Sequence, residues 1–297
     1  MTTLRIDLPL PAGYRPDDAL AFHGRDKERL AEQVDGLAVR KGVVLDGAPV
    51  LLAIGIDPGA GTARCTVDTD ALTPRIEAQA MESLAGMLGL RIDPAQFAAS
   101  VRDDALLGPL VRQRPGLRVI QSATIFEALT WAIIGQQINL SFAIALRRSF
   151  IEQGGRRHPD GLWCYPDAED IARLDAEQLT SRKFSRAKAD TLLRLARLVA
   201  DGQLPLARDA EPADVAERLL AVKGIGPWTV NYSLLRGWGH PDCSLHGDVA
   251  VRSAIARVLG QPDKPSLQEA EAFLQAYRPH RTMAAAYLWT SLAMQTG

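Results

Sequence analysis

Two features of the stretch 219–248 could do chemistry: a glycine-containing turn and an aspartate. The turn is Lys223-Gly224-Ile225-Gly226, where glycine lets the backbone take positive φ and approach another surface closely. Free backbone N–H groups at such a turn, next to a helix N-terminus, suit a phosphate oxygen. Asp248 begins a further helical pattern, where a carboxylate ordinarily caps the helix and is kept ionised by its N–H groups. The stretch therefore predicts phosphate binding at the turn and a stabilised anion a short distance along the chain.

Helices must flank the turn to position these groups. Pro227 is a good first residue for the second helix because its missing N–H would have no partner there. Gly237 and Gly239 end that helix. The apolar positions recur at spacings typical of one helix face, at Val215, Leu219 and Val222 before the turn and at Val230, Leu234 and Leu235 after it.

Three segments carry a resemblance to a known family. They read VKGIGPWTVNY, GDVAVR and, upstream, RPGLR followed by FEALTWAIIGQQINLSFAIAL. A Gly-Ile-Gly turn alone is a weak signal, but Pro-Trp after it and an aspartate twenty-two residues beyond its second glycine make the pattern specific. The chain resembles the helix-hairpin-helix DNA glycosylases, and in particular the AlkA type of DNA-3-methyladenine glycosylase. The resemblance covers most of the chain and is strongest over 114–148 and 180–255.

The resemblance implies base excision repair. An AlkA-type enzyme flips a damaged nucleotide out of the duplex and hydrolyses the N-glycosidic bond of alkylated purines such as 3-methyladenine and 7-methylguanine. Breaking this bond builds positive charge at C1′, so the reaction needs an anion beside the sugar. The resemblance assigns this role of catalytic carboxylate to Asp248. An alkylated purine already carries positive charge and leaves without a dedicated general acid. Trp228 resembles in position the lysine nucleophile of lyase-type relatives, so we expect no strand cleavage.

Two other functions stay open at this point. One is a helix-hairpin-helix glycosylase for another lesion, such as hypoxanthine or an oxidised base. The other is a helix-hairpin-helix DNA-binding protein without catalysis. Asp248 argues against the second, since a pure binding module has no need of an acid at this distance from the hairpin.

The expected base pocket is aromatic. Trp228 and Tyr232 lie one helical turn apart and share a face, so both could stack on a flipped base, more strongly if that base is cationic. Tyr232 fits a core position equally well. The resemblance adds Phe22, from the N-terminal domain, and His280, which stands where close AlkA relatives carry a tryptophan. That departure leaves the width of the pocket open.

The resemblance also assigns contacts with double-stranded DNA. It places a monovalent cation, Na⁺ or K⁺, on main-chain carbonyls of Leu220, Val222 and Ile225. The gap left by the flipped nucleotide would be filled by a side chain from the sequence GQQIN. AlkA-type enzymes often have leucine at the position of Gln137. Since glutamine departs from that pattern, either Gln137 or Ile138 could fill the gap. The residues expected to meet DNA at the hairpin are Gly224, Ile225, Gly226 and Thr229.

The fold class is expected to be α+β. Short apolar alternations broken by Gly and Pro predict a small antiparallel β-sheet domain with helices over residues 1–92. Residues 93–297 predict a mainly α-helical, two-lobed glycosylase domain with its active-site cleft between the lobes. Within it we expect single helices over 94–111 and 282–294, a helical pattern running on through 125–150, and a loop over 154–166.

Composition limits the remaining possibilities. The net charge of −1, from 34 basic and 35 acidic residues, does not mark a nucleic-acid binder, but binding needs only a local basic face and backbone donors. Three scattered cysteines indicate reduced thiols and cannot ligate a four-cysteine iron–sulfur cluster. No apolar run is long enough to span a membrane and no signal peptide is evident. We therefore expect a cytoplasmic monomer that requires no cofactor.

Overall fold

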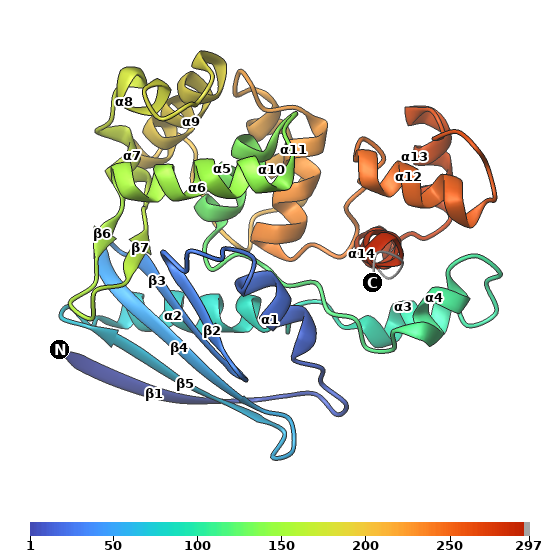
Figure 1. Ribbon diagram of the computed structural model, residues 1–297, viewed down its shortest axis with the longest axis horizontal. Helices are drawn as coiled ribbons and strands as arrows, with labels where there is room; N and C mark the ends of the chain where they lie inside the picture. Colours follow the sequence, from blue (N-terminus) through green and yellow to red (C-terminus); the bar gives the residue numbers. More distant parts are fainter. Residues whose placement is uncertain (294–297) are drawn as a thin grey trace.

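The N-terminal part of the chain forms a twisted sheet backed by one long helix. The structure is a computed structural model that describes residues 1–293 (Figure 1). The sheet runs in the order β1-β5-β4-β3-β7-β6, with β2 also paired to β3. Its strands are β1 (Thr2–Pro9), β2 (Glu32–Asp35), β3 (Ala38–Leu45), β4 (Ala48–Asp57), β5 (Thr62–Thr69), β6 (Arg156–Arg157) and β7 (Trp163–Tyr165).

Local sequence explains the central hairpin of this sheet. The strands β3 and β4 pair in antiparallel register, with Val43 opposite Val50. The turn between them is Asp46-Gly47, and both residues have positive φ (47° and 74°). A two-residue turn of this kind matches the twist of the flanking strands, which explains the Asp-Gly sequence.

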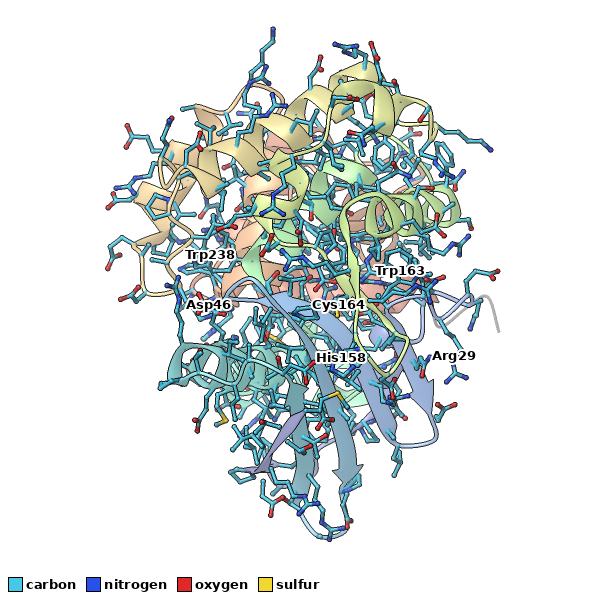
Figure 2. All side chains as sticks on the ribbon, turned by 90° about the vertical axis from the view of Figure 1, so that its left-hand side faces the viewer. Arg29, Asp46, His158, Trp163, Cys164 and Trp238 are labelled. Carbon is cyan, nitrogen blue, oxygen red and sulfur yellow. The ribbon has the colours of Figure 1, made fainter. Side chains whose placement is uncertain are left out.

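The expected loop over 154–166 instead contains strands β6 and β7, which complete the sheet. Strand β7 pairs with β3 in parallel, the one parallel contact within the described part of an otherwise antiparallel sheet. Gly42 permits this approach, because a Cβ there would lie 2.3 Å from the carbonyl oxygen of Trp163. Figure 2 shows Trp163 and Cys164 at the junction between the sheet and the helices above it. This pairing joins segments about 120 residues apart, so local patterns carry no signal for it.

Helices form the rest of the described chain. Helix α2 covers the sheet with buried Ile76, Ala80 and Leu84, and it begins after Thr73, whose hydroxyl accepts from the Ile76 N–H. The helices of the N-terminal region and first lobe are α1 (Asp17–His23), α2 (Pro74–Met87), α5 (Ile125–Gly135), α6 (Leu140–Gly154), α7 (Ala168–Ala172), α8 (Ala176–Thr180), α9 (Arg186–Ala200), α10 (Pro212–Leu220), α11 (Pro227–Ser233) and the π-helical turn η1 (Leu234–Trp238).

A second group of helices lies to the right in Figure 1. Helix α14 packs against helices from both ends of this part of the chain, since it contacts α12 and α13 as well as α3 and α4. The C-terminal helix α14 therefore packs against residues 94–113. Its helices are α3 (Pro94–Ser100), α4 (Gly108–Gln113), α12 (Val249–Val258), α13 (Leu267–Gln275) and α14 (Arg281–Ala293).

Two helix predictions need correction. The single helix expected over 94–111 is two short helices, because the chain turns tightly after α3 and the Asp104 carboxylate accepts the N–H groups of Leu106 and Leu107 before α4. The pattern through 125–150 is broken at 136–139, where Gln137 has a φ of 56° and Asn139 caps the next helix. The last helix begins one residue before the expected Thr282, and Met294 lies outside the described residues. The division at residue 92 stays a prediction.

Candidate active site

Asp248 lies where the two helical lobes meet. It caps α12, and its Oδ1 accepts the backbone N–H of Val251 at 3.0 Å. The indole N–H of Trp289 donates to the same oxygen at 3.0 Å, and the indole N–H of Trp228 donates to Oδ2 at 2.9 Å. Three neutral N–H donors, from α11, α12 and α14, thus fix one half-buried carboxylate.

The charge of this carboxylate is not cancelled locally. Within residues 1–293, no lysine, arginine or histidine nitrogen lies within 4.0 Å of Asp248. Neutral donors hold the carboxylate in place without adding an opposite charge, so its negative charge can act on a neighbouring group. The site can therefore stabilise a cation that develops beside it.

Two indoles that contact Asp248 belong to a larger group of aromatic side chains. Trp228 and Tyr232, four residues apart on α11, stack with centroids 5.1 Å apart and planes at 28°. Tyr232 also faces Trp289 at 6.3 Å, and its hydroxyl accepts from the Trp131 indole at 3.0 Å. We call Phe22, Trp131, Trp228, Tyr232 and Trp289 the aromatic cluster. The predicted pairing of Trp228 with Tyr232 is thus present in the structure.

Two arginines lie over rings of the aromatic cluster. The Arg25 guanidinium carbon is 4.0 Å from the Phe22 centroid and 4.7 Å from that of Trp131. The Arg236 guanidinium carbon is 5.0 Å from the Phe22 centroid, 5.5 Å from that of Trp289 and 6.0 Å from that of Tyr232. Burial lowers the pKa of Arg25, although Glu32 acts in the opposite direction. The sequence reasoning missed both arginines. Arg236 lies four residues after Tyr232, so helical spacing was a signal that could have found it, whereas no local spacing links Arg25 to the hairpin.

Phe22 reaches the aromatic cluster because its helix, α1, is held in place by the next residue, His23. His23, the next residue, is fully buried and bonds to Glu32 through Nδ1 at 3.2 Å and to the Met87 carbonyl through Nε2 at 3.1 Å. Glu32 belongs to what we call the buried ionic cluster, in which Lys41 and Arg147 hold Glu32 and Glu127. Since these residues come from β2, β3, α5 and α6, the cluster ties the sheet to the helices and sets the position of α1.

His280 does not join the aromatic cluster. Its ring packs against Phe97, with centroids 6.4 Å apart, just before α14 begins. The tryptophan that reaches Asp248 from this part of the chain is Trp289, within α14. Tyr287 stacks on Phe97 at 5.6 Å, and a residue two positions further along a helix points to roughly the opposite side. The base-binding role expected for His280 stays a prediction, and Trp289, which contacts Asp248, was not singled out from the sequence.

The hairpin has the expected two helices, α10 and α11, but its two glycines differ. Gly224 has a φ of 99°, and a Cβ there would lie 2.1 Å from the Thr191 hydroxyl on α9, so the turn needs glycine. Gly226 has a φ of −110° and caps α11 in extended conformation, so the expectation of positive φ was wrong for it. A Cβ at Gly226 would meet no atom within 4 Å, which leaves an open approach to the turn.

Other predicted contact residues are placed as follows. Ile225 and Thr229 are buried, and the Thr229 hydroxyl accepts from the side chain of Gln136, so neither side chain is displayed to a duplex. Gln137 is exposed, whereas Ile138 is half-buried and packs on the helical core. The carbonyl oxygens of Leu220 and Ile225 accept no hydrogen bond from another described residue, and that of Val222 accepts one, from Ile225. The monovalent cation expected at these carbonyls stays a prediction.

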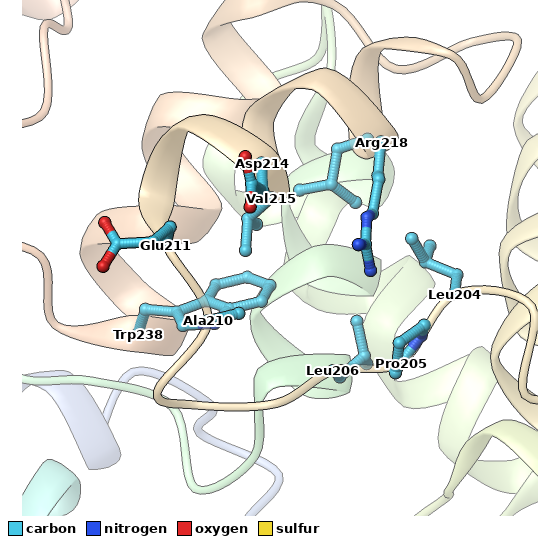
Figure 3. Close-up of a pocket in the computed structure, with 10 residues that line it drawn as sticks. Leu204, Pro205, Leu206, Ala210, Glu211, Asp214, Val215, Arg218 and Trp238 are labelled. Atoms are coloured by element: carbon cyan, nitrogen blue, oxygen red, sulfur yellow. The ribbon is translucent and has the colours of Figure 1, made fainter.

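Two cavities lie away from Asp248. One, of about 90 Å³, is enclosed by α10 and the segment 204–210, with Trp238 and Arg218 in its wall (Figure 3). The other, of about 760 Å³, lies between the β3–β4 turn, α2, and the start of α5. Neither is lined by a residue of the aromatic cluster. Among residues 1–293 no group of three His, Cys, Asp or Glu side chains is arranged to hold a metal, and no helix is long and apolar enough to cross a membrane.

A helix-hairpin-helix followed by a stabilised aspartate defines a class of DNA-repair fold, and comparisons with known proteins agree. The profile of the HhH-GPD superfamily base excision DNA repair proteins matches residues 130–279. The chain is 34% identical to YfjP of Bacillus subtilis over 63% of this chain and 65% of that one. It is 33% identical to the DNA-3-methyladenine glycosylase of the same organism over 67% of this chain and 68% of that one. The chain belongs to the HhH-GPD superfamily.

A solved structure supports the fold over almost the full length. The 3-methyladenine DNA glycosylase from Archaeoglobus fulgidus superposes with a TM-score of 0.80. The match covers 96% of this chain and 97% of that one, at 21% sequence identity. The sheet domain and both helical lobes thus occur together in another protein of this architecture.

Proposed function

We propose that this chain is a DNA glycosylase that excises alkylated purines, such as 3-methyladenine and 7-methylguanine, from double-stranded DNA. The observation that carries the proposal is Asp248, an anion fixed by three neutral N–H donors beside stacked aromatic rings. Cleavage of the N-glycosidic bond leaves positive charge on the sugar, and the uncancelled carboxylate stabilises it. Similarity to a DNA-3-methyladenine glycosylase supports the substrate class.

The aromatic cluster would receive the flipped base. Within the described residues Trp228 is the one member with no guanidinium over its ring, and the face that is not stacked on Tyr232 would attract a cationic base. Its indole N–H binds Asp248, which places the ring next to the reacting bond. Because position 228 carries an indole and not an amine, no Schiff base forms there and the product strand stays intact.

The hairpin would hold the duplex. Its free N–H groups around Gly224 and Gly226 face a DNA phosphate, and the carbonyls of Leu220, Val222 and Ile225 hold a monovalent cation, Na⁺ or K⁺, whose charge adds to the attraction for that phosphate. We propose that the enzyme works as a monomer in the cytoplasm and needs no other cofactor.

The test is single-turnover release of free base from a duplex that contains one 7-methylguanine. We expect the free base to appear with the strand intact until alkali is added, and borohydride to trap no covalent adduct. A trapped adduct would overturn the monofunctional assignment. Absence of base release from 7-methylguanine, 3-methyladenine and hypoxanthine duplexes alike would overturn the glycosylase assignment.

A second substrate class is favoured by the two arginines. Arg25 and Arg236 place positive charge over four of the five rings, and this charge repels a cationic base. A neutral lesion such as hypoxanthine meets no such repulsion. The ratio of 7-methylguanine to hypoxanthine release by the wild type decides whether attraction of a cationic base to the Trp228 ring or its repulsion by the two arginines dominates.

A further inference from the structure

The segment between α5 and α6 is hydrogen-bonded to the hairpin through one side chain. The amide nitrogen of Gln136 donates to the Gly224 carbonyl at 3.1 Å and to the Thr229 hydroxyl at 2.9 Å. These partners lie on the two sides of the hairpin turn, about 90 residues along the chain. One amide thus fixes the distance between the turn and the GQQIN loop.

A lysine from a third element holds the same loop from the other side. The ammonium group of Lys188, on α9, donates to the carbonyls of Ile134 at 2.7 Å and Gln136 at 2.6 Å. Both carbonyls belong to the C-terminal end of α5, where helix carbonyls lack intrahelical partners and attract a cation. Lys188 is half-buried, and this partial burial lowers the pKa of its ammonium group. Its side chain therefore restrains the loop through two hydrogen bonds.

The residue displayed by this arrangement is Gln137. It is exposed, and its φ of 56° is a left-handed conformation that costs a non-glycine residue energy unless the surroundings impose it. Gln136 and Lys188 restrain the chain before it, and Asn139, whose side chain caps α6, restrains the chain after it. Ile138 is packed inward. Of the two candidates for filling the gap in the duplex, the geometry favours Gln137.

We propose that Gln136 and Lys188 are positioning residues that couple phosphate binding at the hairpin to the entry of Gln137 into the duplex. This inference rests on the proposed function. Phosphate contacts bind every duplex alike, whereas gap filling stabilises only the state with a flipped nucleotide. A fixed distance between the two lets binding energy from the first favour the second. Without the coupling, the protein still binds DNA but flips nucleotides less often.

The test compares Gln136→Leu and Lys188→Met with the wild type on three DNA substrates. For undamaged duplex we expect affinities within about threefold of wild type, since the hairpin remains. For base release from a fully paired 7-methylguanine duplex we expect a loss of about 10- to 100-fold. For the same lesion in single-stranded DNA, where no gap needs filling, we expect a loss of less than about threefold. Equal losses on paired and single-stranded DNA would overturn the proposal.

A fluorescence measurement separates this inference from the proposed function. A duplex with a stable abasic analogue next to 2-aminopurine reports loop insertion and needs no catalysis. We expect wild type to change the fluorescence and both variants to reduce that change at saturating protein. Equal changes for wild type and variants would overturn the coupling, whereas a wild type that inserts but releases no base from any lesion would overturn only the glycosylase assignment.

Matched variants guard against misfolding and simple charge loss. Gln136→Glu keeps the size of the side chain but replaces the donor with an acceptor, and should behave as Gln136→Leu. Lys188→Arg keeps a cationic donor and should restore most of the paired-duplex activity. Arg186→Met removes an exposed cation from the same helix and should leave the ratio of paired to single-stranded activity at the wild-type value. A changed ratio in Arg186→Met would assign the effect to charge alone and contradict the inference.

Discussion

The buried ionic cluster and the Asp248 site hold their carboxylates in opposite ways. Glu32 and Glu127 are fully buried and bonded to Lys41 and Arg147 at 2.5–3.1 Å. Burial alone raises the pKa of Glu32, but Arg147 and Lys41 outweigh it and hold that pKa well below its ordinary value. Asp248 is held by two indoles and one backbone N–H, and remains half-buried.

The difference separates a structural anion from a reactive one. Opposite charges in contact largely cancel each other's field, so Glu32 and Glu127 have less effect on a further cation than an unpaired carboxylate has. Neutral N–H donors fix geometry without cancelling charge, so Asp248 can stabilise such a cation. The number of hydrogen bonds to a carboxylate is thus a poor guide to function, and the charge of the donors is the better one.

Replacing Asp248 is the strongest way to test this comparison. Asp248→Asn keeps the shape and one cap acceptor but removes the charge, so we expect base release to fall by at least about 100-fold in single-turnover assays. Duplex affinity should stay within a few-fold of wild type, because the hairpin is unchanged. A variant with near-wild-type turnover would remove Asp248 from the reaction.

Breaking the buried ionic cluster should affect stability instead of chemistry. Lys41→Met leaves two buried carboxylates with one cation, and we expect the free energy of unfolding to fall by about 3–5 kcal/mol in urea titrations. The matched control is Arg75→Met, which removes an exposed ion pair with Asp46 and should change it by less than about 1 kcal/mol. Base release per folded molecule should be unchanged in both. Loss of catalysis in a fully folded Lys41→Met variant would contradict the assignment of a purely structural role to the buried ionic cluster.

Acid should act through the same cluster. The pKa values of Glu32 and Glu127 are lowered in the folded protein, so these groups stabilise it above their unfolded pKa of about 4.3 and lose that effect as the pH falls below it. We expect the urea midpoint to be nearly constant from pH 7 to 5 and to drop below about pH 4.3. Glu127→Gln should show a shallower acid drop. An equally steep drop in this variant would assign the acid sensitivity to other groups.

The smallest effect comes from the indole donors. Trp289→Phe keeps the ring but removes one neutral donor to Asp248, so we expect base release to slow by about tenfold, the value of one hydrogen bond to a charged group. The control Trp238→Phe removes an indole N–H bonded to the Ala207 carbonyl and should leave the rate unchanged. Equal rates for Trp289→Phe and wild type would show that the two remaining donors, from Trp228 and Val251, are enough to hold Asp248 for catalysis.

Local sequence determined the hairpin and the helix cap. Helix faces, the Pro227 start and the Asp248 cap depend on residues three or four positions apart, so the sequence displays them directly. The Trp228–Tyr232 pair follows from the same spacing. The family resemblance then gave these residues an expected chemistry, which the sequence pattern alone leaves open.

Only the tertiary structure decided which residues far apart in the sequence meet, at Asp248 and elsewhere. Trp289 reaches it from 41 residues away, Arg25 and Phe22 come from the other end of the chain, and Lys41 meets Glu127 across 86 residues. Strand β7 joins β3 in parallel over a still longer separation. Such contacts form because whole elements bury their apolar faces against one another, and that packing fixes which polar side chains meet. No spacing within one segment encodes the result, which is why the sequence did not point to the contact between Trp289 and Asp248.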